Sequence, residues 1–169
     1  MITIEPPSTR SNPMPPAKSG LTRFLRRARE VVGLAGAVEV LLTSDAEIKR
    51  LNRDFRGKNK PTDVLSFPAP EEIAAQHAGD LAISLDTAAR QAESFGHSLG
   101  EEVRVLMLHG LLHLTGMDHE VDSGEMAARE AELRRELKLP ATLIERTTGS
   151  PARPARAPRR KTAAKRRRA

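Results

Sequence analysis

The segment EEVRVLMLHGLLHLTG, residues 101–116, places apolar side chains on almost every side of a helix. A helix without a polar face has to be surrounded by other elements, because any exposed side would leave apolar surface in water. Gly116 favours the left-handed turn that ends such a helix. The segment therefore predicts a buried central helix over about residues 99–115, with the rest of the chain packed around it.

The segments outside this helix alternate between helical and extended patterns. Ser44, with Glu47 three residues later, has the pattern of a capping box at a helix start. The order predicts an α+β fold, α/β-like in character: a single small domain with a three- to four-stranded mixed sheet packed with about five helices. The expected elements are helices at 21–34, 44–55, 85–96 and 122–139, and strands at 37–43, 63–67 and 80–84.

The two ends of the chain differ in composition from the middle. Residues 1–20 are rich in Pro, Ser and Thr and predict a largely flexible lead that can include a short strand at its start. Residues 147–169 hold nine Lys or Arg and no acidic residue, which leaves 19 basic and 22 acidic residues in the first 146. We expect a domain over 21–146 and a disordered basic tail that tethers RNA through its charge. A merely solubilising tail is the alternative.

Composition also argues against several classes of protein. The chain has 169 residues, enough for one core, and no Cys, so a disulfide-linked partner and a thiolate zinc site are excluded. The absence of Trp and Tyr, with only four Phe, argues against a base-stacking platform for RNA. No secretory signal and no apolar run of membrane-spanning length is present, so we expect a cytoplasmic protein that does not bind membranes.

Three of the five histidines fall within HGLLHLTGMDH, residues 109–119. His109 and His113 are four residues apart and project from one face of the central helix. Two unpaired imidazoles in a core are costly to desolvate, and a shared metal ion removes that cost. A turn at Gly116 would bring His119 to the same point. Three neutral histidines leave a fourth zinc position open, as in catalytic sites.

We therefore expect one Zn²⁺ per chain, held by His109, His113 and His119, although three imidazoles also suit nickel, copper or iron. The alternative is a set of packed or hydrogen-bonded histidines. The other two histidines fit a site less well. His77 is expected in a solvated loop and His97 between two helices, where it has some chance of lying near the site because its helix leads into the ligand helix.

The histidine spacing matches the metalloprotease pattern H-E-x-x-H-x-x-G-x-x-H, but Gly110 replaces the glutamate that serves as general base. Asp118 is the nearest substitute, either as a catalytic base or as a residue that orients a histidine. It could equally cap the turn after the helix. A ribose phosphodiester carries its own nucleophile, the 2′-OH, and mainly needs its charge neutralised. The missing glutamate therefore favours phosphodiester over peptide chemistry.

The loop RGKNKPT, residues 56–62, follows a predicted helix and carries three cations. Arg56 is suited to bidentate phosphate binding, and Lys58 and Lys60 add positive charge along the loop. These residues are the candidate RNA-binding set, with Arg56 also a catalytic candidate. A charged loop that is simply solvated is the alternative.

Three motifs together resemble the YbeY family of bacterial endoribonucleases, also called rRNA maturation factors. They are FRGKNKPTDVLSFP at 55–68, GDLAIS at 79–84 and the histidine segment at 109–119, and the similarity extends over about residues 21–140. Two positions depart from the family pattern: Met117, where Tyr is common, and Asn59, where an acid is usual. Neither is a ligand candidate. The lead and the basic tail lie outside the match.

The resemblance implies a small sheet around the ligand helix and a zinc-dependent, single-strand-specific endoribonuclease. It further implies a role in 16S rRNA 3′-end maturation and ribosome quality control, with ribosomal RNA and the small ribosomal subunit as partners. It assigns the metal to His109, His113 and His119 and places Arg56 in the same cleft, on the RNA phosphate. Two alternatives stay open: a non-catalytic, zinc-stabilised ribosome-assembly factor and, with less support, a zinc metalloprotease.

Overall fold

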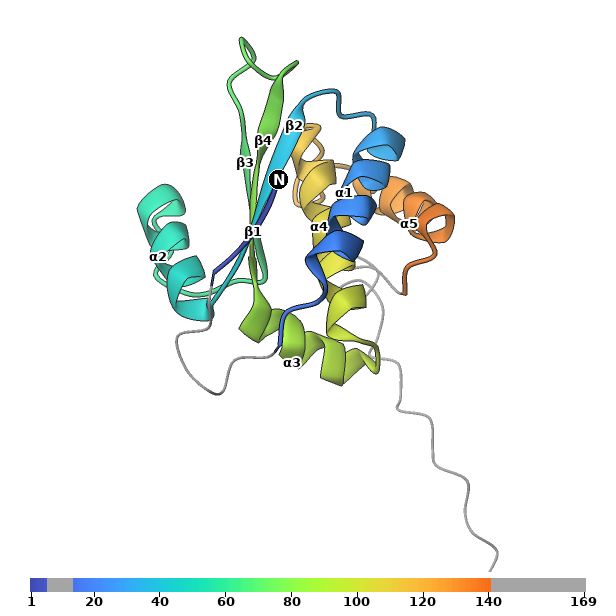
Figure 1. Ribbon diagram of the computed structural model, residues 1–169. Coiled ribbons are helices and arrows are strands. Elements are labelled where there is room, and N and C mark those ends of the chain that lie inside the picture. Colours follow the sequence, from blue (N-terminus) through green and yellow to red (C-terminus); the bar gives the residue numbers. More distant parts are fainter. Residues whose placement is uncertain (6–13, 141–169) are drawn as a thin grey trace, which may run out of the picture.

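The structure is a computed structural model that describes residues 1–5 and 14–140. Within these residues it contains a four-stranded mixed sheet and five helices, which confirms the predicted α+β domain (Figure 1). In chain order the elements are β1 (Ile2–Ile4), α1 (Lys18–Val32), β2 (Ala37–Thr43), α2 (Asp45–Arg56), β3 (Val64–Pro68), β4 (His77–Ser84), α3 (Leu85–Phe95), α4 (Leu99–Leu114) and α5 (Glu125–Leu137).

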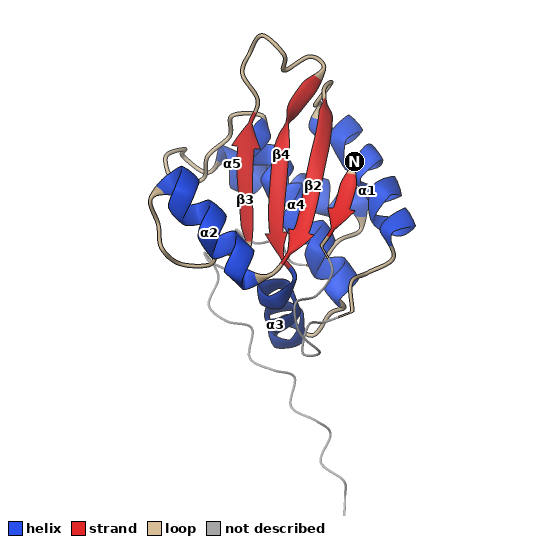
Figure 2. Ribbon diagram, turned by 60° about the vertical axis from the view of Figure 1, so that its left-hand side comes forward, coloured by secondary structure: helices blue, strands red, loops and turns tan. Residues whose placement is uncertain are grey.

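The strands lie in the order β1-β2-β4-β3 (Figure 2). β1 pairs parallel with β2, and β2 pairs parallel with β4, so helices have to carry the chain between these strands. β3 runs antiparallel to β4 and forms one edge of the sheet. The open side of β3 is therefore available to line a site.

Helix α4 is the central element of the fold. Figure 1 shows α2 on one face of the sheet, with α1, α4 and α5 on the other. α4 contacts β3 and β4 as well as α1, α3 and α5, which explains why its sequence has no polar face. Burying each large apolar side chain contributes about 1.5–3 kcal/mol. Its fully buried residues include Val103, Val105, Leu106, Met107, Leu108 and Leu111.

Gly110 lets α4 lie directly on the sheet. A Cβ atom at this position would lie 2.8 Å from Cδ2 of Leu81 on β4 and 3.3 Å from Oγ of Ser66 on β3. The Ser66 hydroxyl also donates a hydrogen bond to the Gly110 carbonyl, 3.2 Å away. Residue 110 thus faces the sheet, and its lack of a side chain has a packing cause.

Helix boundaries agree with the local capping signals. Ser44 caps α2 by accepting from the Glu47 N–H, but the reciprocal bond expected for a capping box is replaced by contacts of the Glu47 carboxylate with Arg50. Ser84 caps α3, and Gly96 ends it at φ 72°. α5 is shorter than the predicted 122–139, because the Asp122 side chain accepts from backbone N–H groups at the helix start.

Differences from the predicted elements lie mainly at strand and helix starts. α1 begins at Lys18 and Ile2–Ile4 forms β1, so parts of the predicted lead 1–20 belong to the fold. The short strand expected at the start of the lead is present. Strand β4 begins at His77, because its parallel pairing with β2 reaches Ala37. The prediction of a loop at His77 was therefore wrong.

Residues 6–13 and 141–169 lie outside the described residues, and with them the predicted basic tail 147–169 and the end of the predicted domain. None of the helices in the described part of the chain has the length and apolar character needed to span a membrane.

Candidate active site

The structure brings His109, His113 and His119 together. The first two project from the last turns of α4, and the chain then turns at Gly116, which has φ 90°. The three ring centroids lie 4.8, 5.2 and 5.5 Å apart, and one nitrogen from each ring falls within 4.8 Å of the others. The local turn geometry thus produces the convergence expected from the motif spacing.

Glu130 orients the first histidine. Its Oε1 lies 2.9 Å from Nδ1 of His109, and both side chains are buried. A carboxylate at this nitrogen favours the tautomer with the proton on Nδ1, which leaves the Nε2 lone pair for another partner. Nε2 of His109 in turn lies 3.1 Å from Nε2 of His113. Two acceptor-capable nitrogens therefore converge at the cleft.

The donor set fits a metal ion. Zinc–imidazole bonds are about 2.0–2.1 Å long, so two nitrogens on a tetrahedral ion lie about 3.4 Å apart. The 3.1 Å separation of the His109 and His113 Nε2 atoms is close to that value. Nδ1 of His119 is buried without a hydrogen-bond partner among the described residues, so this polar atom is available as a metal donor.

The protonation state of His113 agrees with a ligand role. Burial and the neighbouring His109 and His119 rings lower its pKa, while the nearby Asp118 carboxylate opposes this shift. Neutral imidazole is the form that binds metals, and a lowered pKa keeps the ring neutral at neutral pH.

The three histidines and Asp118 form one wall of the site. The second wall comes from the end of α2 and the basic loop, residues 56–62. Arg56 donates from Nη2 to the Ser66 carbonyl oxygen, 3.2 Å away. Asn52, only 2% exposed, donates from its side chain to the Lys60 carbonyl at 2.8 Å, and its backbone carbonyl accepts from the Lys58 N–H. Asn52 thus holds the loop that carries the predicted RNA-binding residues.

The backbone of β3 faces the space between the two walls. Ser84 and Asp63 form a hydrogen-bonded pair of the β3–β4 ladder, since the Ser84 N–H donates to the Asp63 carbonyl at 2.9 Å. Hydrogen-bonded and non-hydrogen-bonded pairs alternate along an antiparallel ladder. The N–H and C=O groups of Ser66, three positions after Asp63, therefore point away from β4 toward the open edge of the sheet. The Arg56 bond to the Ser66 carbonyl agrees with that orientation.

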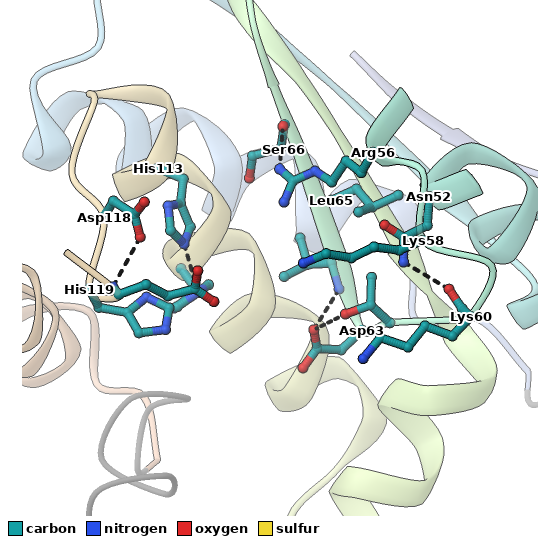
Figure 3. Close-up of a pocket in the computed structure, with 14 residues that line it drawn as sticks. Asn52, Arg56, Lys58, Lys60, Asp63, Leu65, Ser66, His113, Asp118 and His119 are labelled. Carbon is teal, nitrogen blue, oxygen red and sulfur yellow. Dashed lines mark hydrogen bonds between the residues drawn. The ribbon is translucent and has the colours of Figure 1, made fainter. Parts of the chain in front are cut away.

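Both walls line one cleft with a volume of about 410 Å³. In Figure 3, His113, His119 and Asp118 face Arg56 and Lys58 across it. The structure thus brings together every candidate site residue predicted from the sequence. Among the lining residues, as many acids as bases occur: Arg56, Lys58 and Lys60 against Asp63, Asp118 and Glu120.

Asp118 both organises the turn after α4 and lies in the site, the two placements considered for it. Its Oδ1 accepts from the Glu120 N–H at 3.0 Å, and its carbonyl accepts from the N–H groups of Val121 and Asp122, so it organises the turn. Its side chain also lines the cleft beside His113.

The remaining two histidines do not line the cleft. His77 pairs with Asp80 on the same strand, with Nε2 3.2 Å from Oδ1. His97 is largely buried and pairs with the carboxylate of Glu102 in the first turn of α4. Both therefore have local partners away from the metal candidates.

Among the residues of the site that were not predicted, two support it from buried positions on helices. Glu130 follows Met126 by four positions and precedes Leu133 by three, so it is an acid on the buried stripe of α5. Asn52 follows Ile48 by four positions on the buried side of α2. A polar residue on an apolar stripe is the sequence signal that both share, but it does not identify the partner.

Comparison with known proteins bears on the same residues. The family described as "Endoribonuclease YbeY" matches residues 14–138, which include both walls of the cleft and Glu130. The chain belongs to the YbeY family. The resemblance inferred from the three motifs is thereby confirmed.

YbeY relatives are similar over most of their length. The chain is 58% identical over 132 residues to the endoribonuclease YbeY of Koribacter versatilis, covering 78% of this chain and 85% of the relative. It is 42% identical over 124 residues to that of Helicobacter pylori strain 26695, covering 73% and 88%. A solution structure from Thermotoga maritima is 30% identical, with a TM-score of 0.53, and the match covers 81% of this chain and 89% of that chain.

Proposed function

We propose that this chain is a zinc-dependent, single-strand-specific endoribonuclease of the cytoplasm. Its proposed role is 16S rRNA 3′-end maturation and ribosome quality control. The observation that carries the activity is the cleft itself, which three convergent histidines and Arg56 line together. The substrate class, RNA, rests on the names of the YbeY relatives. The role in rRNA maturation is what the resemblance of the three motifs to that family implies.

Arg56 binds the phosphate of the scissile linkage in this proposal. One of its terminal nitrogens donates to Ser66, which fixes the plane of the guanidinium and leaves further N–H groups for a phosphate. Lys58 and Lys60 form no ion pair within the described residues. They lie along the same loop and, in this proposal, bind the neighbouring phosphates of the RNA backbone.

The histidines hold one metal ion, with Glu130 keeping His109 in the ligating tautomer. When bound, Zn²⁺ supplies positive charge against the phosphate and acidifies bound water. That charge is needed, because the acidic and basic side chains that line the cleft balance each other.

Asp118 is the proposed proton acceptor. Its carboxylate lines the cleft beside two of the ligands, whereas position 110, used for the base in metalloproteases, faces Leu81 and the sheet. A 2′-OH nucleophile needs less activation than the water that attacks a peptide bond. The orientation of Gly110 therefore argues further against the metalloprotease alternative, which keeps only the histidine spacing in its support.

The decisive experiment compares the wild type, His113→Ala and Arg56→Ala on a single-stranded rRNA precursor fragment, with and without a chelator. Arg53→Ala is the matched control, because Arg53 lies on the same helix but pairs with Asp54 and does not line the cleft. We expect chelator-sensitive cleavage by the wild type and the control only.

Equal cleavage by all four proteins would assign the activity to a contaminant. Loss of folding in His113→Ala without any wild-type cleavage would instead favour the non-catalytic, zinc-stabilised assembly factor. Melting temperature and metal content, measured on the same samples, separate these outcomes.

A further inference from the structure

An aromatic pair lies on the surface next to the basic wall of the cleft. Phe55, on the last turn of α2, is 68% exposed. Within the described part of the chain, its ring contacts that of Phe67 on β3, at a centroid distance of 5.3 Å and an interplanar angle of 68°. This edge contact holds the Phe55 ring in place but leaves most of it in water.

The pair lies beside the phosphate-binding groups on both chain segments that carry it. Phe55 directly precedes Arg56, and Phe67 directly follows Ser66, whose carbonyl accepts the Arg56 hydrogen bond. Asn52, one helical turn before Phe55 and Arg56, lines the cleft. Figure 3 shows Arg56 and Ser66 together at the upper end of the cleft. The aromatic pair therefore borders the place where the guanidinium would hold a phosphate.

We propose that Phe55 stacks on an unpaired nucleobase of the nucleotide whose phosphate binds Arg56. This inference rests on the proposed nuclease function and deepens it, because it names the group that recognises an unpaired strand. A duplex base has both faces covered by its neighbours, whereas a single-stranded base offers a free face to an aromatic ring. Phe67 supports the ring from the sheet side.

The arrangement needs only one exposed ring. The small number of aromatic residues argued against a platform for base stacking, but two of the four Phe gather at this point. Stacking on one ring tolerates any base, while the charge of the adjacent loop binds the backbone. The expected result is preference for single strands without strong sequence preference.

A fluorescent variant tests the contact directly. The chain contains no Trp and no Tyr, so Phe55→Trp would introduce its only strong fluorophore. We would titrate the zinc-loaded variant with a single-stranded oligonucleotide that is 2′-O-methylated and cannot be cleaved. Stacking should produce saturable quenching, and an oligonucleotide of equal length with abasic sites should bind through its phosphates with much less quenching.

Phe95→Trp is the matched control. Phe95 is also an exposed Phe at a helix end, 49% exposed, but it belongs to α3, which contributes no residue to the lining of the cleft, whereas α2 contributes Asn52 and Arg56. Unchanged fluorescence of Phe55→Trp at oligonucleotide concentrations that saturate binding by anisotropy would overturn the proposal. Equal quenching in both variants would also overturn it.

Kinetics provide the second test. Phe55→Ala should raise KM for single-stranded RNA roughly tenfold, with a smaller change in kcat, while Phe55→Tyr should stay near the wild type. Melting temperatures of both variants show whether the fold is intact. Wild-type kinetics of a folded Phe55→Ala would contradict the stacking role. Lack of cleavage by the wild type would instead contradict the proposed function, since the fluorescence test does not depend on cleavage.

Discussion

Oε1 of Glu130 lies 2.9 Å from Nδ1 of His109, and both side chains are excluded from solvent. The two residues belong to different helices, α5 and α4, so the packing of these helices places a carboxylate behind the metal candidate. A buried acid on the far side of an imidazole fixes its tautomer and raises its basicity as a ligand.

Substitution of Glu130 should therefore weaken metal binding. We expect Glu130→Ala to lower zinc affinity about 10–100-fold and Glu130→Gln to lower it less, because the amide oxygen still accepts from Nδ1. Competition with a chromophoric chelator measures the affinity. Glu132→Gln, an exposed change on the same helix, is the control. Unchanged affinity in Glu130→Ala would show that the carboxylate does not support a ligand.

Metal removal should weaken RNA binding as well as cleavage. The cationic residues lining the cleft are matched by as many acids, so a bound dication determines its net positive charge. We expect the chelated wild type and His113→Ala to bind single-stranded RNA more weakly than the zinc-loaded wild type, as measured by anisotropy. Equal affinities with and without zinc would mean that the side chains alone bind the strand.

Gly110→Ala should destabilise the protein slightly. The new methyl group would lie 2.8 Å from a methyl of Leu81, which is itself buried. Overpacking of this kind costs roughly 1–3 kcal/mol, while the better helix propensity of alanine offsets about 1 kcal/mol. Gly110→Glu should be much more destabilising, because it also buries a charge. Urea unfolding of the metal-free proteins measures both, and a stable Gly110→Glu would contradict the packing argument.

Asp45 should make the folded state sensitive to acid. Burial raises its pKa, but hydrogen bonds from Ser84, Arg90 and Thr87 outweigh burial and hold the pKa below its usual value of 3.8. A carboxyl with a lowered folded-state pKa contributes stability above the unfolded-state pKa and loses it as pH falls through the folded-state pKa. Asp45→Asn should therefore be less stable at neutral pH and lose less on acidification.

Urea unfolding of metal-free protein, from neutral pH down to about pH 3, measures this difference. Asp54→Asn is a suitable comparison, because Asp54 is an exposed acid of the same helix whose ion pairs within residues 1–5 and 14–140 are with arginines of that helix. Parallel stability curves for the wild type and Asp45→Asn would show that the hydrogen bonds do not favour the ionised form.

Deletion of residues 147–169 should weaken RNA binding at low salt and flatten its salt dependence. The segment carries nine Lys or Arg and no acid, and each phosphate contact adds about 0.7 to the slope of log K against log salt for a single strand. Anisotropy titrations at several salt concentrations give the slope. An unchanged slope would leave the tail with only a solubilising role.

Local sequence patterns were sufficient for most elements of the fold. The apolar segment 101–116 predicted a central helix. The four-residue spacing of His109 and His113 predicted their shared face, and Gly116 predicted the turn. These features depend on residues within a few positions of one another. Strand β1 and the start of β4 were less accessible, because pairing with β2, distant in the chain, determines them.

The sequence alone also supplied the family and the candidate ligands, since motif identity and spacing are local properties of the chain. Only the tertiary structure placed Glu130 behind His109, turned Gly110 toward Leu81 and set Phe55 against Phe67. Each of these contacts joins elements that are separated in sequence, and their distances depend on how helices and strands pack. An apolar stripe specifies that a face is buried, but not which side chain it meets.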